Sequence, residues 1–276
     1  MKGELQKFRT DRYTSFDSSK LKYYPAANPN GKGVLICPGG GYSFLAIDGE
    51  GQVPAQFVNE LGFDAWVLQY TTTTGRTTPP PWLQRLIEAA QSATGPIDFS
   101  QFQEPVEELT DPIYPAPMHE AAAALAYIRS QKTLSKLGIW GFSAGGHLAG
   151  VALTTPANNV DFGILSYPVL ALEGPYAHLG SARNLIGENP PAGLAAELSV
   201  QNRVSASTPP TFLFHTTNDT AVSVKNTLLF ANAMGKHNRP FQLCILPDGH
   251  HGLGLALDSP MHNWTSELER FLTYSI

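Results

Sequence analysis

The chain has 276 residues, a length that single α/β domains often reach, and 42% of its residues are hydrophobic. Charged residues make up 15% of the chain, the formal net charge is −5, and no basic block is present, which argues against a nucleic-acid partner. The chain has no uninterrupted apolar run of about 18 residues and its start lacks the apolar core of a signal peptide, so we expect a soluble cytoplasmic protein without a membrane partner.

Short apolar runs predict the β-strands of the fold. In chain order they are Gly33–Cys37, Asp64–Tyr70, Leu137–Phe142, Phe162–Leu170, Thr211–Thr216 and Phe241–Leu246. Nearly all of their residues are apolar, as in strands that are buried on both faces of a parallel sheet. Helix-like segments accompany them at Met118–Gln131, Ser223–His237 and Asn263–Ser275. Alternating strands and helices predict an α/β fold, with a doubly wound, mostly parallel sheet flanked by helices, in a single domain over residues 1–276.

Residues 71–117 interrupt this alternation. The segment begins with TTTTGRTTPPP and ends with DPIYPAP, and a helix-like stretch and an acidic stretch lie between them. So long a connection within a compact domain is usually either functional or disordered. Because the segment carries its own apolar residues, among them Trp82 and Phe99, we expect an ordered insertion near the active face that serves as a lid or as an oligomer contact.

The two cysteines, Cys37 and Cys244, both lie within apolar strand-like runs. This placement predicts two buried free thiols. A disulfide between them is the alternative, although nothing in the sequence requires one.

A G-x-S-x-G pattern, formed by residues 141–145, stands where a predicted strand meets a helix-like segment. Small residues beside a serine allow a sharp turn from strand to helix, which lifts the hydroxyl out of the sheet. The free N–H groups at the start of the helix then point toward the same place, where negative charge is favoured. We therefore predict Ser143 as a nucleophile activated by a nearby base. A tight turn with a structural serine is the alternative.

Three consecutive glycines follow the first predicted strand, in the sequence CPGGGYSF. Glycine lets a backbone approach a ligand closely, and N–H groups in such a loop would suit the oxyanion of an acyl-transfer reaction. We assign this role to Gly40 and Gly41, together with the N–H of Ala144, and expect Tyr42 and Phe44 to line a compact pocket for the substrate. A flexible or phosphate-binding loop is the alternative, but the common nucleotide-binding glycine motifs are not matched here.

The acid and the base should follow the serine in the order Asp or Glu, then His. Asp219 follows the run Thr211–Thr216, and both His250 and His251 follow the run Phe241–Leu246, in loops where catalytic groups of open α/β sheets collect. We predict Asp219 as the acid and His251 as the base, with His250 as the alternative base. No ligand set with metal-binding spacing surrounds the histidine pair, so we expect no metal.

Of the other histidines, His147 lies one helical turn after Ser143, and His215 lies within a strand run. We expect His147 to pack or to form hydrogen bonds rather than to act as a base, and His215 to be structural. Neither His178 nor the remaining histidines stand near a predicted nucleophile in the sequence.

These motifs resemble those of the serine esterases of the α/β-hydrolase superfamily. The stretches CPGGGY, WGFSAGGHLAG, ILSYPV, PPTFLFHTTND and GHHGLGLA occur in the expected order. They are most similar to bacterial acetyl-xylan-esterase-like and lipase-like carboxylesterases related to hormone-sensitive lipase. The resemblance covers most of residues 31–256 and is interrupted between residues 71 and 113. It implies Ser143 as the nucleophile, Asp219 as the acid, His251 as the base, and an oxyanion hole of Gly40, Gly41 and Ala144.

The sequence thus predicts a serine carboxylesterase that hydrolyses short-chain, acetyl-type esters through an acyl-enzyme intermediate. The expected partner is a small-molecule ester, and no cofactor is expected. An arylformamidase or a small peptidase would use the same fold and triad, and a catalytically inactive hydrolase-like binding domain is a second alternative. The alcohol part of the ester and the formation of a homo-oligomer stay open.

Overall fold

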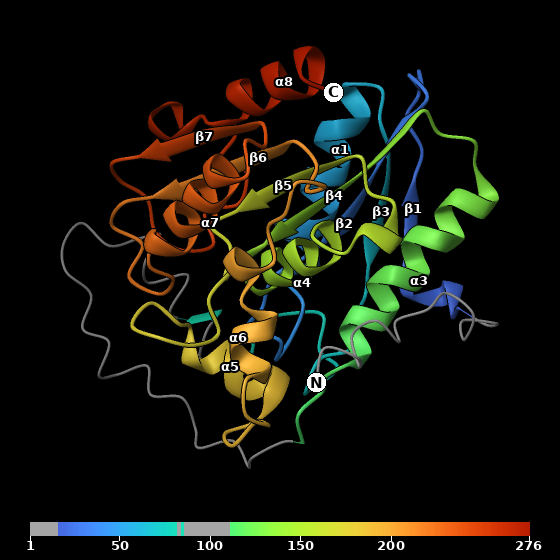
Figure 1. Ribbon diagram of the computed structural model, residues 1–276. Coiled ribbons are helices and arrows are strands. Elements are labelled where there is room, and N and C mark those ends of the chain that lie inside the picture. Colours follow the sequence, from blue (N-terminus) through green and yellow to red (C-terminus); the bar gives the residue numbers. More distant parts are fainter. Residues whose placement is uncertain (1–15, 82–83, 86–110) are drawn as a thin grey trace.

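The computed structural model describes residues 16–81, 84–85 and 111–276 (Figure 1). The strands form one seven-stranded sheet in the order β1-β3-β2-β4-β5-β6-β7. β1 is antiparallel to β3, and all other neighbouring pairs are parallel. The strands are β1 (Leu21–Tyr24), β2 (Lys32–Cys37), β3 (Asp64–Leu68), β4 (Lys136–Phe142), β5 (Phe162–Ser166), β6 (Thr211–Thr216) and β7 (Phe241–Leu246). The predicted doubly wound, mostly parallel sheet is confirmed.

Helices connect most of the strands. The α-helices are α1 (Val53–Glu60), α3 (Ala116–Gln131), α4 (Ser143–Leu153), α5 (Leu179–Ile186), α6 (Leu194–Leu198), α7 (Lys225–Lys236) and α8 (Thr265–Tyr274). Short 3-10 turns are η3 (Ser18–Lys20), η6 (Pro156–Asn158), η7 (Val200–Asn202) and η8 (Pro260–His262), and η4 (Asp48–Gln52) is a π-helical turn. In the part of the chain that the structure describes, none of these helices has the length and apolar character needed to cross a bilayer.

The core consists of two apolar clusters, one on each face of the sheet. Successive strand residues point to opposite faces, so Leu35 of β2 belongs to the cluster under α3, α4 and α7, whereas Ile36 belongs to the cluster under α1 and α8 (Figure 1). Full burial of each large apolar side chain contributes about 1.5–3 kcal/mol. The sheet is therefore a rigid platform, and the loops at the carboxyl ends of its strands are held in fixed positions.

Two predicted strands match the structure residue for residue, β6 and β7, whereas β5 is shorter than predicted. The sequence predicts a strand over Phe162–Leu170, but β5 ends at Ser166. Tyr167 has a φ of 37°, in the left-handed region, and Pro168, which follows it, has no N–H to donate to a sheet. The chain therefore turns out of the sheet at Tyr167, and the prediction is wrong beyond Ser166.

The edge strand β7 is less buried than its apolar sequence suggests. Phe241 is 39% exposed and Leu243 is 37% exposed. Among the strands that the structure describes, β7 pairs only with β6. Its side chains therefore lie at the rim of the core, and the prediction of burial on both faces is wrong for this strand. Cys244 of β7 is accordingly only half-buried, while Cys37 of β2 is buried, and both cysteines are free.

Four of the described strands and α-helices were not predicted: β1, α1, α5 and α6. β1 has the sequence LKYY, in which no residue is fully buried, so it carries no apolar run. The helices α5 and α6 are short and lie side by side below the sheet in Figure 1, so each has few residues to display a helical period. Their packing against the rest of the fold, rather than their own sequence, fixes them.

The predicted insertion, residues 71–117, is described at its two ends only; residues 82–83 and 86–110 lie outside the described residues. At its start, the N–H of Thr73 donates to the carbonyl O of Tyr42, and the N–H of Leu45 donates to the carbonyl O of Arg76, at 3.0 and 2.9 Å. At its end, the N–H of Tyr114 donates to the carbonyl O of Leu185 in α5 at 2.8 Å. A role for the segment as a lid or as an oligomer contact stays a prediction.

Candidate active site

Ser143 is the first residue of α4 and directly follows β4. Its φ of 50° lies in the left-handed region, which is strained for a residue other than glycine and makes the turn from strand to helix sharp. A Cβ atom at Gly141 would lie 2.1 Å from the carbonyl O of Gly145, and one at Gly145 would lie 2.1 Å from the carbonyl O of Cys37. The close packing of this turn therefore requires glycine on both sides of the serine.

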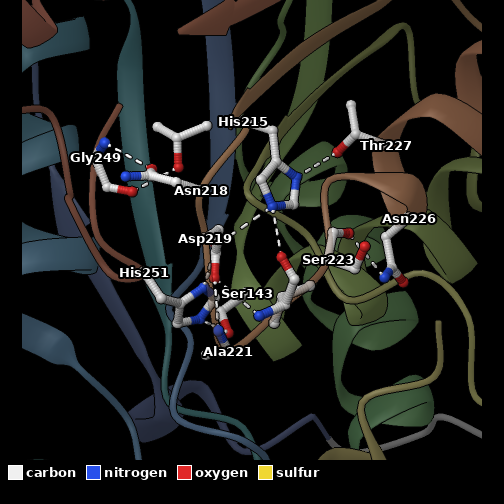
Figure 2. A network of polar contacts seen from close by, with 12 residues as sticks. Ser143, His215, Asn218, Asp219, Ala221, Ser223, Asn226, Thr227, Gly249 and His251 are labelled. Carbon is white, nitrogen blue, oxygen red and sulfur yellow. Dashed lines mark hydrogen bonds and ion pairs between the residues drawn. The ribbon is translucent and has the colours of Figure 1, made fainter. Parts of the chain in front are cut away.

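Ser143, His251 and Asp219 form one hydrogen-bonded chain (Figure 2). The Oγ of Ser143 lies 2.8 Å from Nε2 of His251, and Nδ1 of His251 lies 2.7 Å from Oδ2 of Asp219. Asp219 follows β6 and His251 follows β7; because both strands run parallel to β4, all three residues lie at the same edge of the sheet. The structure thus brings together the three residues that the sequence predicts.

His250, the alternative base, has a different environment. It is exposed, and its Nδ1 lies 2.7 Å from the backbone carbonyl O of His251. The hydrogen-bonded chain to Ser143 and Asp219 passes through His251, so the geometry favours His251 over His250.

The carboxylate of Asp219 is buried and receives several donors. Its Oδ1 accepts the N–H groups of Ala221 and Val222 at 2.9 and 2.8 Å. Burial by itself would raise the pKa of Asp219, but hydrogen bonds from His215, His251 and the Val222 N–H outweigh it and hold the pKa well below its ordinary value. Asp219 is therefore ionised at neutral pH and can stabilise a positive charge on His251.

A second histidine, His215 of β6, also faces Asp219 (Figure 2). Its Nε2 lies 2.9 Å from the carbonyl O of Val222 and 3.3 Å from Oδ2 of Asp219, and its Nδ1 lies 2.7 Å from Oγ1 of Thr227. A carbonyl oxygen accepts only from a protonated nitrogen, so Nε2 carries the proton and Nδ1 accepts the hydroxyl of Thr227. From the sequence we expect His215 to be structural, and in the structure it supports the carboxylate of Asp219.

The glycine loop lies directly beneath the serine turn. Gly40 and Gly41 have φ angles of 129° and 64°, which glycine adopts at no steric cost. The N–H of Gly39 donates to Glu50, whereas no acceptor for the N–H groups of Gly40 and Gly41 is found among the described residues. The N–H of Ala144 lies in the first turn of α4, where helical N–H groups have no partner within the helix. These are the three groups that the sequence predicts as the oxyanion hole.

Sequence reasoning missed Glu50, a buried carboxyl beside this loop. Its Oε2 accepts the N–H of Gly39 at 2.7 Å, and its Oε1 accepts the hydroxyl of Tyr167 at 2.8 Å. Burial raises the pKa of Glu50, and the hydrogen bonds from Tyr167 and Gly39 and the charge of His251 offset this only in part. Nothing in the local sequence, DGEGQ, distinguishes Glu50 from an exposed acid, because its partners are distant in the chain.

Comparison with known families agrees with this geometry. Residues 116–275, more than half of the chain, match the model of the prolyl oligopeptidase family. The chain belongs to the prolyl oligopeptidase family. The resemblance to the α/β-hydrolase superfamily that the sequence motifs carry is thereby confirmed.

The relatives of this prolyl oligopeptidase family member include enzymes named for xylan. Endo-1,4-beta-xylanase B of Butyrivibrio fibrisolvens is 30% identical over 250 residues, which cover 84% of this chain and 34% of the relative. Acetylxylan esterase of Xylanibacter ruminicola is 27% identical over 263 residues, which cover 93% of this chain and 48% of the relative. The chain therefore spans about a third and about half of the length of these two curated relatives.

A crystal structure gives a match over nearly the whole length of both chains. It is an acetyl ester-xyloside bifunctional hydrolase from Caldicellulosiruptor lactoaceticus, 32% identical to this family member. The match has a TM-score of 0.72 and covers 97% of this chain and 94% of that chain.

The two residues predicted to line the substrate pocket, Tyr42 and Phe44, are both buried in this family member. Tyr42 is 0% exposed, and its hydroxyl lies 2.7 Å from Nδ1 of His147. The prediction is therefore wrong for the side chain of Tyr42, which supports the glycine loop from inside the protein. Phe44 is also buried but keeps a small exposed area, so its contact with substrate stays a prediction.

His147 is the buried hydrogen-bond partner of Tyr42. Its Nε2 lies 2.9 Å from the carbonyl O of Leu198, so Nε2 carries the proton and Nδ1 accepts the hydroxyl of Tyr42. Burial lowers the pKa of His147 to about 4, which keeps the ring neutral at pH 7. The expectation that His147 packs and forms hydrogen bonds, rather than acting as the base, is confirmed.

The helix α5 forms a further wall beside the glycine loop. Nδ2 of Asn184 donates to the carbonyl O of Gly41 at 2.9 Å, and His178 caps the helix by accepting the N–H of Ser181 through Nδ1 at 3.2 Å. The neutral ring therefore carries its proton on Nε2. Burial, and then the charge of His251, lower the pKa of His178. The sequence could not place His178 near the site because α5 was not predicted.

Within the described residues, no group of three or more His, Cys, Asp or Glu side chains is arranged to hold a metal ion.

Proposed function

We propose that the protein is a serine carboxylesterase that hydrolyses acetyl-type esters through an acyl-enzyme intermediate. The observation that carries the proposal is the hydrogen-bonded chain from Ser143 through His251 to Asp219. It lies beside a glycine loop whose Gly40 and Gly41 N–H groups have no acceptor among the described residues. The names of an acetylxylan esterase and of a near-full-length structural relative that acts on acetyl esters support the choice of ester class.

In the acylation step, Nε2 of His251 removes the proton of Ser143 while Oγ attacks the ester carbonyl carbon. The carbonyl oxygen becomes an oxyanion, and the N–H groups of Gly40, Gly41 and Ala144 donate to it. Each such donor typically stabilises the transition state by about 2.7–4 kcal/mol. The bond to the alcohol oxygen then breaks, and the proton held by His251 passes to the leaving alcohol.

In the deacylation step, water replaces the alcohol. His251 removes a proton from the water as it attacks the acyl carbon, and the same N–H groups stabilise the second oxyanion. The bond to Ser143 breaks, the serine regains its proton from His251, and the carboxylic acid leaves. Asp219 keeps the correct nitrogen of His251 available in both steps and stays ionised throughout.

For the substrate, we propose an acetyl ester carried by a sugar, as in acetylated xylan fragments. The support is that two relatives are named for both acetyl esters and xylan or xyloside. The cytoplasmic location expected from the sequence stays a prediction, and the formation of a homo-oligomer stays open.

Hydrolysis of p-nitrophenyl acetate, butyrate and octanoate by the wild type and by Ser143→Ala tests this proposal. We expect the rate to fall with acyl length and to vanish in the variant. A rate that rises steadily toward octanoate would exclude the acetyl preference, and full activity in Ser143→Ala would exclude the serine mechanism. Release of acetate from acetylated xylo-oligosaccharides tests the sugar part.

The alternatives predict different outcomes in the same assay. An arylformamidase would prefer N-formylkynurenine over the aryl esters, and a small peptidase would cleave a dipeptide amide. A binding domain without catalysis would cleave none of these substrates and would not react with a fluorophosphonate probe.

A further inference from the structure

Glu50 contacts the backbone of the glycine loop. Its Oε2 accepts the N–H of Gly39, the residue directly before the two predicted oxyanion donors. Gly39 is packed against the serine turn, since a Cβ atom there would lie 2.8 Å from both the carbonyl O of Phe142 and the Cβ of Ser143. The hydrogen bond from Gly39 therefore sets the direction in which the next peptide groups face the serine.

The second carboxylate oxygen of Glu50 is connected, through Tyr167, to the loop that carries His251. The hydroxyl of Tyr167 donates to Oε1 of Glu50 and accepts the N–H of Gly254 at 3.0 Å. The ring of Tyr167 meets the ring of His251 edge to face, with centroids 5.3 Å apart and planes at 71°. The backbone of Tyr167 is itself fixed, because its N–H donates to the carbonyl O of Phe214 at 2.6 Å.

We propose that Glu50 is a positioning residue that, through Gly39 on one side and Tyr167 on the other, holds the oxyanion donors and His251 in register around Ser143. The inference rests on the proposed function, because an oxyanion hole serves acyl transfer. Glu50 and Tyr167 act as one unit, which we call the brace. Glu50 accepts the N–H of Gly39 and the hydroxyl of Tyr167, and that hydroxyl accepts the N–H of Gly254 in the loop that carries His251.

Asp64 is a matched control within the same chain. It is also a buried carboxylate, and it also accepts one tyrosine hydroxyl, from Tyr23 at 3.0 Å, and one backbone N–H, from Ala26 at 3.1 Å. It differs from Glu50 in one further contact, an ion pair in which its Oδ2 lies 2.5 Å from Nζ of Lys132. It stands at the start of β3, the opposite end of the sheet from Ser143. Loss of Asp64 should therefore affect stability but not catalysis.

The test compares Glu50→Ala, Glu50→Gln, Tyr167→Phe, the double variant Glu50→Ala with Tyr167→Phe, and Asp64→Asn. For each we would measure kcat and KM on p-nitrophenyl acetate, with active sites counted by a fluorophosphonate probe. The rate of labelling by that probe and the urea midpoint of unfolding complete the set.

We expect Glu50→Ala to lower kcat by about 10- to 100-fold, as small displacements of catalytic groups do, while KM changes by less than about threefold. Glu50→Gln should retain more activity, because its amide oxygen can accept from Gly39 and its amide nitrogen can donate to Tyr167. Adding Tyr167→Phe to Glu50→Ala should lower kcat little further, since both substitutions disrupt the same brace. Asp64→Asn should leave kcat within about twofold.

The proposal is overturned if kcat per active site and the labelling rate stay within about twofold of wild type in the Glu50 variants, because stability alone would then have changed. If Glu50→Ala does not fold, Glu50→Gln and Tyr167→Phe decide the question by the same criterion. A wild type that reacts with the probe but hydrolyses no ester would refute the proposed function while the labelling rates still test the brace. A wild type that does not react would refute both.

Discussion

Two buried carboxyl groups, Asp219 and Glu50, flank the serine turn, and their pKa values are shifted in opposite directions. They are almost equally buried, at 8% and 7% exposure. Yet the pKa of Asp219 is held well below its ordinary value and that of Glu50 is raised. Asp219 receives two backbone N–H groups and faces two histidines, whereas Glu50 receives one N–H and one tyrosine hydroxyl. Burial raises the pKa of both groups, and the number and charge of the donors reverse the shift only at Asp219.

The largest expected effect on catalysis follows from replacing Asp219. Asp219→Asn should lower kcat by about 10⁴-fold, as the same change does in a well-studied serine protease triad, because an amide no longer holds the proton on Nδ1 of His251. Steady-state kinetics on p-nitrophenyl acetate would show it. A loss no larger than that of Glu50→Gln would mean that the two carboxyl groups are equivalent, contrary to the comparison above.

The second effect is on stability as a function of pH, and it has opposite signs at the two sites. Asp219 binds its proton less tightly in the folded state, so its contribution is present above its ordinary pKa of 3.8 and is lost as the pH falls below that value. Glu50 binds its proton more tightly when folded, so its contribution is present below its ordinary pKa of 4.5 and is lost as the pH rises through the raised value. Each group can change the free energy of unfolding by at most about 1.4 kcal/mol per pH unit.

Urea unfolding of the wild type, Asp219→Asn and Glu50→Gln between about pH 3 and pH 8 measures these slopes, since the window spans the ordinary carboxyl pKa values. The stability advantage of the wild type over Asp219→Asn should shrink on acidification. Its advantage over Glu50→Gln should shrink as the pH rises. Slopes of the same sign would show that the two carboxyl groups share one environment.

A smaller loss of kcat should follow from replacing His215, the second histidine that contacts Asp219. His215→Gln weakens the support of the carboxylate by about one hydrogen bond, so we expect kcat to fall about fivefold, with KM nearly unchanged. Thr227→Val is the control, because it removes only the hydroxyl behind His215. If both variants lose the same activity, His215 acts through packing rather than through Asp219.

The smallest effect concerns His250, the neighbour of the predicted base. It is exposed, and within the described part of the chain its ring bonds the backbone carbonyl O of His251. His250→Ala should leave kcat within about twofold, as surface substitutions usually do. A large loss would shift the base from His251 to His250 and would uncouple Asp219 from the reaction.

The sequence predicted the parts of the site that lie on strong local patterns. Ser143 follows an apolar strand and stands between two glycines, and Asp219 and His251 follow apolar strands in the expected chain order. Because parallel strands end at one edge of the sheet, order along the chain was enough to bring these residues together.

The sequence could not predict what depends on contacts between distant residues. Glu50 bonds Gly39, 11 residues away, and Tyr167, 117 residues away, so no local pattern marks it. Burial was misjudged for the same reason. Tyr42 lies inside the protein, within the apolar core and with its hydroxyl on His147, and β7 is partly exposed because it lies at the edge of the sheet. Apolar composition identifies a strand but not its neighbours.

The central claim is that Ser143 is a nucleophile activated by His251, and mapping the adduct of a fluorophosphonate probe tests it most directly. Intact-protein and peptide mass spectrometry would be carried out on the wild type, on Ser143→Ala and on His251→Ala. We predict one adduct per chain, on Ser143, no adduct in Ser143→Ala, and much slower labelling in His251→Ala. An active enzyme that carries no adduct, or carries it on another residue, would contradict the account.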